Sequence, residues 1–209
     1  MASVRSTSLD APSSGPAWEI ARLFPEQGHL SESDYLLVTE RTRQLVEFTD
    51  GCIEVLPTPT LEHQEIVLFL VNLLRAFVQP AKLGRAVMAP YRVRIADDRF
   101  REPDVVFVLE SNRSRMGSRF GESADLVMEV VSEDDPTRDL IDKRADYAAA
   151  GIAEYWIVDP RGGTITVLRL ENGQYAVHAE ANAGGQVHSA ILQGFTVDVA
   201  AVFAAARHG

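Results

Sequence analysis

Three short segments of the chain are almost entirely apolar, and they limit the folds that are open to it. They are DVVFVL at 104–109, DLVMEVVS at 125–132 and EYWIVD at 154–159. Each has the length of a strand and is rich in β-branched or aromatic residues, which favours β-structure. Because strands of this kind are apolar on both faces, they belong in a sheet that is covered on both sides. We therefore expect a layered α/β or α+β domain.

The segments around these strands predict helices. The range 31–40 opens with Ser-x-x-Asp, a pattern similar to a capping box, and predicts a short helix. The range 61–79 predicts a long helix in which polar residues form only a narrow stripe. We expect most of that helix to be covered by protein, in part by a second copy of the chain in a homodimer. The range 137–150 predicts a third helix, ended by Gly151.

A hairpin is predicted before the long helix, at QLVEFTDGCIEVL (44–56). Its two β-rich runs flank Asp50-Gly51, and glycine tolerates the positive φ of a tight turn. We expect Cys52 to be a buried small hydrophobe. Further strands are predicted at AVMA, YRVRI, TITVLRL, QYAVHAE and FTVDV. The fold class is thus α/β (α+β), a mixed β-sheet flanked by helices with an extra N-terminal hairpin and C-terminal strands.

Composition indicates the cellular compartment and the number of domains. Residues 1–17 are rich in serine, alanine and proline and predict a disordered tail, which leaves one domain at 18–209. No apolar run approaches the length of a membrane span, and the single cysteine cannot form an internal disulfide. We expect a cytoplasmic protein with no membrane partner.

The distribution of charge is uneven. A formal net charge of -10 argues against a protein that binds nucleic acid by bulk electrostatics. Between residues 85 and 119 arginines outnumber the acidic residues. Two interpretations of this basic segment stay open: contact with phosphate, or a solvated surface joined by salt bridges. The residues concerned are Arg85, Arg92, Arg94, Arg99, Arg101, Arg113, Arg115 and Arg119.

Two carboxylates stand at the predicted buried strands. Asp104 follows Pro103 at the start of one strand, where it suits either a hard cation or ordinary turn chemistry. Glu129 lies inside LVMEVVS, and alternation places it on the same face as Val127 and Val131. Burial of this carboxylate requires a pairing, a proton or a metal, whereas on an edge strand it would simply be solvated.

The third helix carries a lysine that is unusual in this chain. Lys143 is one of two lysines beside 18 arginines. Spacing by four places it on one helix face with Asp139 and Tyr147, so an ordinary helix-stabilising pair with Asp139 explains it too. A lysine ammonium is nevertheless a compact donor that suits orientation of a water and stabilisation of phosphoryl charge.

In chain order these features resemble a known enzyme superfamily. Pro103-Asp104, then Glu129 in an apolar strand, then a lysine resembles the PD-(D/E)XK nucleases, although their plain pattern puts the lysine where this chain has Val131. The sequence is more specifically similar to the Uma2 family of restriction-endonuclease-like proteins, in which the lysine lies on the following helix. The similarity runs over about 30–200, through REPDVVFV, DLVMEVVS, the helix with Lys143 and Tyr147, and EYWIVDP.

This resemblance implies a site for a divalent metal. Asp104 and Glu129 would bind Mg²⁺ or Mn²⁺ with a backbone carbonyl near Val130, and Lys143 would position the attacking water. These three side chains are the predicted catalytic residues. The resemblance further implies an endonuclease that acts on DNA; a catalytically silent binding or structural module with the same fold, and a phosphodiesterase acting on RNA or nucleotides, remain as alternatives.

Three other residues are predicted for an outer shell around the metal, each with an ordinary structural alternative. Glu47 precedes the Asp50-Gly51 turn and suits a cross-strand partner equally well. His63 lies in the first turn of the long helix, where a histidine also satisfies free backbone groups. Glu65 on the same helix is explained as well by the helix dipole.

Overall fold

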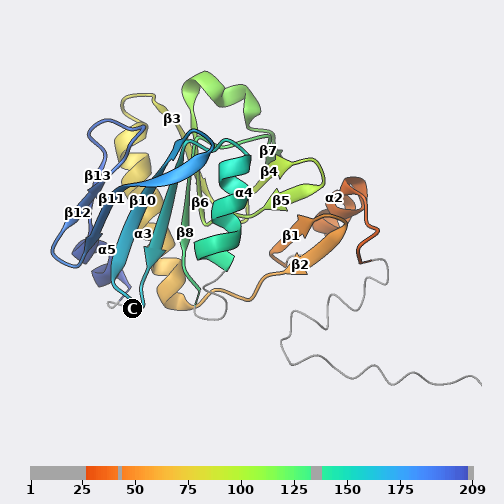
Figure 1. Ribbon diagram of the computed structural model, residues 1–209, viewed down its shortest axis with the longest axis horizontal. Helices are drawn as coiled ribbons and strands as arrows, with labels where there is room; N and C mark the ends of the chain where they lie inside the picture. The colour runs from red at the N-terminus through yellow and green to blue at the C-terminus, as the bar shows by residue number, and fades with distance from the viewer. Residues whose placement is uncertain (1–26, 42–43, 133–137, 207–209) are drawn as a thin grey trace, which may run out of the picture.

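A six-stranded sheet lies at the centre of the computed structural model, which describes residues 27–41, 44–132 and 138–206 (Figure 1). The predicted tail at 1–17 lies outside these residues. The strand order is β11-β10-β9-β8-β6-β3. The strands are β3 (Gly84–Met88), β6 (Val105–Leu109), β8 (Leu126–Val130), β9 (Glu154–Asp159), β10 (Thr164–Glu171) and β11 (Gln174–Asn182).

The sheet is mixed, as the sequence predicts. β8 and β9 are parallel neighbours, and the other pairs in this sheet are antiparallel. Parallel neighbours need a crossover connection. Here the crossover contains a π-helical turn (Arg138–Asp142) and the helix α4 (Lys143–Ala149).

A second sheet has the order β2-β1-β5-β4-β7 and includes the predicted N-terminal hairpin. Its strands are β1 (Val46–Thr49), β2 (Cys52–Val55), β4 (Arg92–Ala96), β5 (Arg99–Arg101) and β7 (Phe120–Gly121). The remaining elements are α2 (Glu32–Arg41), α3 (Leu61–Val78), the 3₁₀ helix η1 (Glu110–Arg115), the strand pair β12 (Gln186–His188) and β13 (Thr196–Asp198), and α5 (Val199–Ala205).

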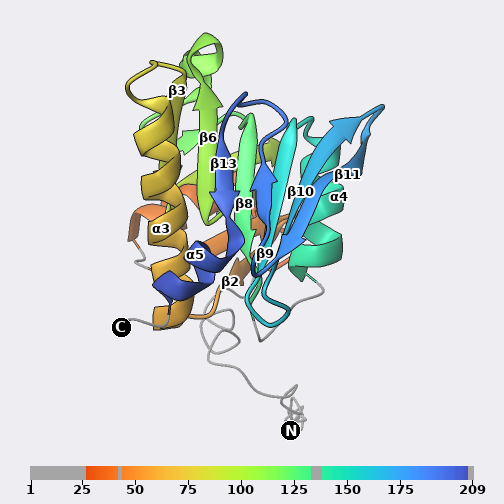
Figure 2. The same ribbon diagram turned by 90° about the vertical axis from the view of Figure 1, so that its left-hand side faces the viewer.

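Both faces of the six-stranded sheet are covered. α3, α5 and the β12–β13 pair pack on one face, whereas α4 and β4 pack on the other (Figures 1 and 2). Along β8, Leu126, Met128 and Val130 belong to the α3 face. Val127 and Val131 belong to the α4 face. The predicted alternation is therefore confirmed, and it directs Glu129 toward α4.

The hairpin β1–β2 forms at the predicted turn but places its cysteine outside the core. Asp50 and Gly51 both have positive φ, at 48° and 79°, and a Cβ on Gly51 would lie 2.8 Å from the carbonyl carbon of Gly28. The prediction of a buried Cys52 is wrong, since this thiol is exposed. Register explains the difference: Ile53 points into the core formed with α2, so its neighbour Cys52 points outward.

The long helix α3 is less covered than its composition predicts. Its buried residues form a single stripe that faces the sheet, whereas Leu61 and Leu68 are exposed by 64% and 44%. An apolar residue on the outer face of a helix is common in monomers and does not require a cover. The contact of this helix with a second subunit stays a prediction.

One buried carboxylate ties the C-terminal segment to the central sheet. Glu154 on β9 is fully buried and accepts hydrogen bonds from Trp156 Nε1 at 2.5 Å and Ser189 Oγ at 2.9 Å. The backbone N–H groups of Ala190 and Ile191 donate to it at 2.6 and 2.8 Å. Four donors compensate the cost of burying the charge, and they fix the loop between β12 and β13 against the sheet.

A membrane span is not found among the helices in the described ranges, since none combines the required length with sufficient hydropathy.

Candidate active site

The centre of the candidate site is a buried triad formed by β8 and α4. Glu129 Oε2 lies 2.8 Å from Lys143 Nζ, and Glu129 Oε1 accepts a hydrogen bond from Tyr147 Oη at 2.5 Å. Their four-residue spacing puts Lys143 and Tyr147 on one face of α4, as predicted. All three side chains are buried. The carboxylate is thus tolerated in the interior because each oxygen has a partner.

The tyrosine of this triad acts as a fixed donor. Burial raises the pKa of Tyr147 well above its ordinary value, and the negative charges of Glu129 and Glu47 raise the pKa further. The hydroxyl therefore stays protonated and donates a hydrogen bond to Glu129. The side chain of Asp139 lies outside the described residues, so its pairing with Lys143 stays a prediction.

Asp104 lies directly beside this triad. Its Oδ2 accepts a hydrogen bond at 2.7 Å from the backbone N–H of Val130, the residue that follows Glu129. His63 Nε2, from the first turn of α3, lies 3.2 Å from the same oxygen. The Asp104 and His63 side chains are 15% and 16% exposed, so water reaches them. Asp104, His63, Glu129 and Lys143 thus gather at one end of the central sheet.

A second buried network fixes the segment that leads to Asp104. Arg101 Nη1 lies 2.6 Å from Glu47 Oε2, and its Nε donates to Asp146 Oδ2 at 3.0 Å. Burial lowers the pKa of Arg101, but Glu47 and Asp146 outweigh it and raise the pKa above its ordinary value. Arg101 therefore stays charged. It joins the end of β5, three residues before Asp104, to Asp146 in α4, the helix that also carries Lys143.

Of the two remaining residues predicted for an outer shell, Glu47 contacts this network and Glu65 does not, within the part of the chain that the structure describes. Glu47 is fully buried, and its Oε1 also accepts a hydrogen bond at 3.0 Å from the backbone N–H of Glu102. It fixes the segment between β5 and β6 that carries Asp104 and lies close enough to Tyr147 to affect the pKa of that hydroxyl. Glu65 is partly exposed, and within the described ranges no hydrogen bond or ion pair joins it to Asp104 or Glu129. Sequence reasoning missed Arg101 and Asp146.

The donor set fits a hard divalent ion that keeps most of its water. Mg²⁺ binds through one or two carboxylates and retains several water ligands. Asp104 and Glu129 supply two carboxylates. They lie close together because Asp104 accepts a hydrogen bond from the N–H of Val130, the neighbour of Glu129, and the exposure of Asp104 admits water. Within the described ranges, no group of three or more histidine, cysteine or carboxylate side chains is arranged to hold a metal ion. The predicted backbone carbonyl ligand near Val130 stays a prediction.

Most of the local arginine excess is neutralised within the chain. Six of the eight arginines counted between 85 and 119 form ion pairs with carboxylates: Arg92, Arg94, Arg99, Arg101, Arg113 and Arg119. The salt-bridged interpretation thus holds for these six.

Comparison with known families decides what kind of protein carries this arrangement. The model of one family, Uma2, described as "Putative restriction endonuclease", matches residues 32–200. The chain belongs to the Uma2 family. This match includes Asp104, Glu129 and Lys143.

The fold of this Uma2 protein is shared with a solved structure. A protein from Anabaena variabilis, described as "a putative nuclease belonging to DUF820", superposes with a TM-score of 0.66 at 18% sequence identity. The similarity covers 82% of this chain and 98% of the other. At that identity the comparison supports the fold. No curated protein matches the chain.

A buried glutamate next to the site makes the stability of this Uma2 protein depend on pH. Burial raises the pKa of Glu102 from 4.5 to about 7, although Arg92, whose Nε lies 2.9 Å away, lowers it. Between these two pH values the Glu102 carboxyl loses its proton in the unfolded chain and keeps it in the folded chain. The free energy of unfolding should therefore fall as pH rises from about 4.5 to about 7. Above that range Glu102 should cause no further change.

Removing the titrating group should remove this dependence. We expect Glu102→Gln to gain stability relative to the natural chain as pH rises from 5 to 8, by up to about 3 kcal/mol. Urea unfolding at a series of pH values, in EDTA, measures the difference. Glu62→Gln, at an exposed position of α3, is the matched control. A difference that stays constant with pH would contradict the raised pKa.

Proposed function

We propose that this Uma2 protein is a metal-dependent endonuclease that hydrolyses DNA phosphodiester bonds, with Asp104, Glu129 and Lys143 at its centre. The observation that carries the proposal is the buried Lys143–Glu129 pair directly beside the solvent-accessible Asp104. Two carboxylates that can hold a divalent ion and one ammonium that can offset phosphate charge suit metal-assisted phosphodiester hydrolysis. The family match supports a nuclease in general.

Each residue has a definite task in this proposal. Asp104 and Glu129 would hold the ion. A bound Mg²⁺ or Mn²⁺ supplies a lowered pKa for a coordinated water and polarises the phosphate. Lys143 Nζ orients the attacking water and offsets the negative charge that develops on the scissile phosphate. Tyr147 keeps Glu129 in place, and His63 Nε2 restrains the carboxylate of Asp104 through its contact with Oδ2.

A second candidate function is a binding or structural module that keeps the nuclease fold without catalysis. The neutralised arginines favour it, because paired guanidinium groups contribute little to attraction of a polyanion. A third candidate, a phosphodiesterase acting on RNA or nucleotides, uses the same site.

Plasmid nicking discriminates these functions. We expect purified protein to convert supercoiled plasmid to the open-circular form in Mg²⁺ or Mn²⁺, and to stop when EDTA is added. Absence of nicking together with cleavage of an RNA oligonucleotide would favour the third candidate. Absence of both would favour the silent module.

A further inference from the structure

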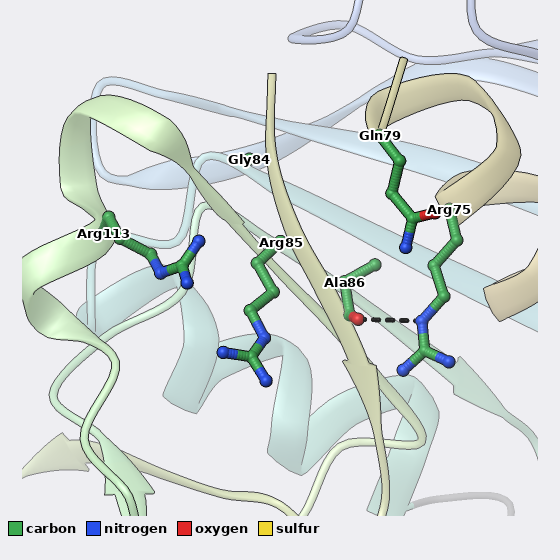
Figure 3. A pocket seen from close by; sticks show the side chains of 6 residues that line it. All are labelled: Arg75, Gln79, Gly84, Arg85, Ala86 and Arg113. Carbon is green, nitrogen blue, oxygen red and sulfur yellow. Dashed lines mark hydrogen bonds between the residues drawn. The ribbon is translucent and has the colours of Figure 1, made fainter. Parts of the chain in front are cut away.

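Three arginines from three different elements line one pocket at the opposite end of β3 from Asp104. Arg75 comes from α3, Arg85 from β3 and Arg113 from η1 (Figure 3). The pocket has a volume of about 390 Å³, and Gln79, Gly84 and Ala86 complete its lining. Figure 3 shows Arg85 and Arg113 on one side of β3 and Arg75 with Gln79 on the other. Three positive charges therefore surround one edge strand of an otherwise acidic protein.

The guanidinium groups of this arginine pocket are largely free to take an external anion. Among the described residues, no carboxylate forms an ion pair with Arg75 or Arg85. Arg113 lies 3.5 Å from Glu110, but both side chains are about half exposed, so that pair is weak. This distinguishes the pocket from the five other arginines in the 85–119 range that pair with acids.

One of these arginines is held in place by the fold. Arg75 Nε donates a hydrogen bond at 3.0 Å to the carbonyl oxygen of Ala86 on the edge strand. That contact uses one N–H group of the guanidinium and leaves the terminal nitrogens for a ligand. A planar guanidinium with adjacent free N–H groups matches phosphate oxygens in a bidentate geometry.

The position of the pocket relates it to the candidate active site. The register of β3 on β6 puts Arg85 opposite Val108, four residues along the strand from Asp104, or about 13 Å. Along α3, Arg75 lies about 18 Å from His63 at 1.5 Å per residue. At 3.4 Å of rise per base pair, these distances correspond to about four or five base pairs of duplex.

We propose that the arginine pocket binds a backbone phosphate of the nucleic acid, four or five base pairs from the phosphate that is cleaved. This inference rests on the proposed nuclease function and deepens it, because it assigns a substrate contact remote from the reacting atoms. The contact would fix the position of the duplex without reading its sequence. It also explains how a chain of net charge -10 can bind a polyanion through a small local cluster of arginines.

Binding measured without cleavage tests this pocket. Fluorescence anisotropy of a labelled 20-base-pair duplex in EDTA gives Kd at several salt concentrations. We expect Arg85→Gln and Arg113→Gln each to weaken binding about tenfold at low salt and to lower the salt slope by about one. Arg115→Gln is the matched control, because Arg115 lies on the same 3₁₀ helix but does not line the pocket. Equal losses in all three variants would show diffuse attraction and overturn the proposal.

The remaining outcomes separate the pocket from the nuclease function. If the variants lose affinity as expected but the natural chain nicks no plasmid, the phosphate contact stands and the nuclease proposal falls. If the natural chain cleaves while Arg85→Gln and Arg113→Gln bind as tightly as Arg115→Gln, the pocket proposal falls alone. Calorimetry with inorganic phosphate gives a further arm: binding of free phosphate that needs Arg85, with duplex affinity unchanged in Arg85→Gln, would also overturn it.

Discussion

Replacing Asp104 with asparagine is expected to lower the rate of metal-dependent plasmid nicking by about 10³-fold. Asparagine keeps the shape of the side chain and can still accept the hydrogen bond from the N–H of Val130. It removes the negative charge that would hold a divalent ion. Lys143→Met should reduce the rate to a similar extent, because the ammonium that offsets phosphate charge is lost. Initial rates of open-circle formation at saturating Mg²⁺ measure both effects.

The matched control for this prediction is Asp97→Asn. Its side chain is 99% exposed, and the change of charge is the same as at Asp104. We expect the control to nick plasmid at the natural rate. Equal residual activity in Asp104→Asn, Lys143→Met and the control would point to a contaminating nuclease and would remove the support for the assigned centre.

Lys143→Met is also expected to destabilise the fold by about 3–5 kcal/mol. The change leaves Glu129 buried, with Tyr147 as a neutral donor but without the ammonium of Lys143. Loss of a cationic partner from a buried carboxylate is costly, because the interior solvates charge poorly. Urea unfolding followed by circular dichroism at pH 7 gives the free energy of unfolding.

A double change separates loss of chemistry from loss of the fold. In Lys143→Met/Glu129→Gln the buried charge is absent, and the amide oxygen can still accept the hydrogen bond from Tyr147. We expect this protein to recover at least about half of the lost stability and to remain inactive. If the double variant is no more stable than Lys143→Met alone, the cost does not arise from the buried charge of Glu129 and the buried-pair interpretation is wrong.

Local periodicity was sufficient to predict the central part of the site. Alternation along β8 placed Glu129 on the face opposite Met128, and the four-residue spacing on α4 brought Lys143 and Tyr147 together. The capping pattern at Ser31 likewise appears as reciprocal hydrogen bonds with Asp34. Each of these predictions depends on contacts within one element or on the two faces of one strand.

Contacts between distant segments could not be predicted in the same way. Arg101 bonds to Glu47 and to Asp146, which lie 54 and 45 residues away in the sequence. An arginine among many arginines carries no signal of its partner, because these ion pairs depend on the pairing of β1 with β5 and on the position of α4. The exposure of Cys52 depended on hairpin register, which shifts every side chain to the other face when it moves by one residue.

The four hydrogen bonds to Glu154 bear on how far this chain can be shortened. Every side chain proposed above to act in catalysis precedes β9, so the part of the chain after β9 looks dispensable for the proposed chemistry. Deleting the segment from Ser189 onward, however, would strip three of the four donors from a fully buried carboxylate and uncover the sheet face beneath α5. A shortened protein therefore requires redesign of Glu154 together with the apolar surface around it, since the candidate site and the C-terminal segment are supported by the same sheet.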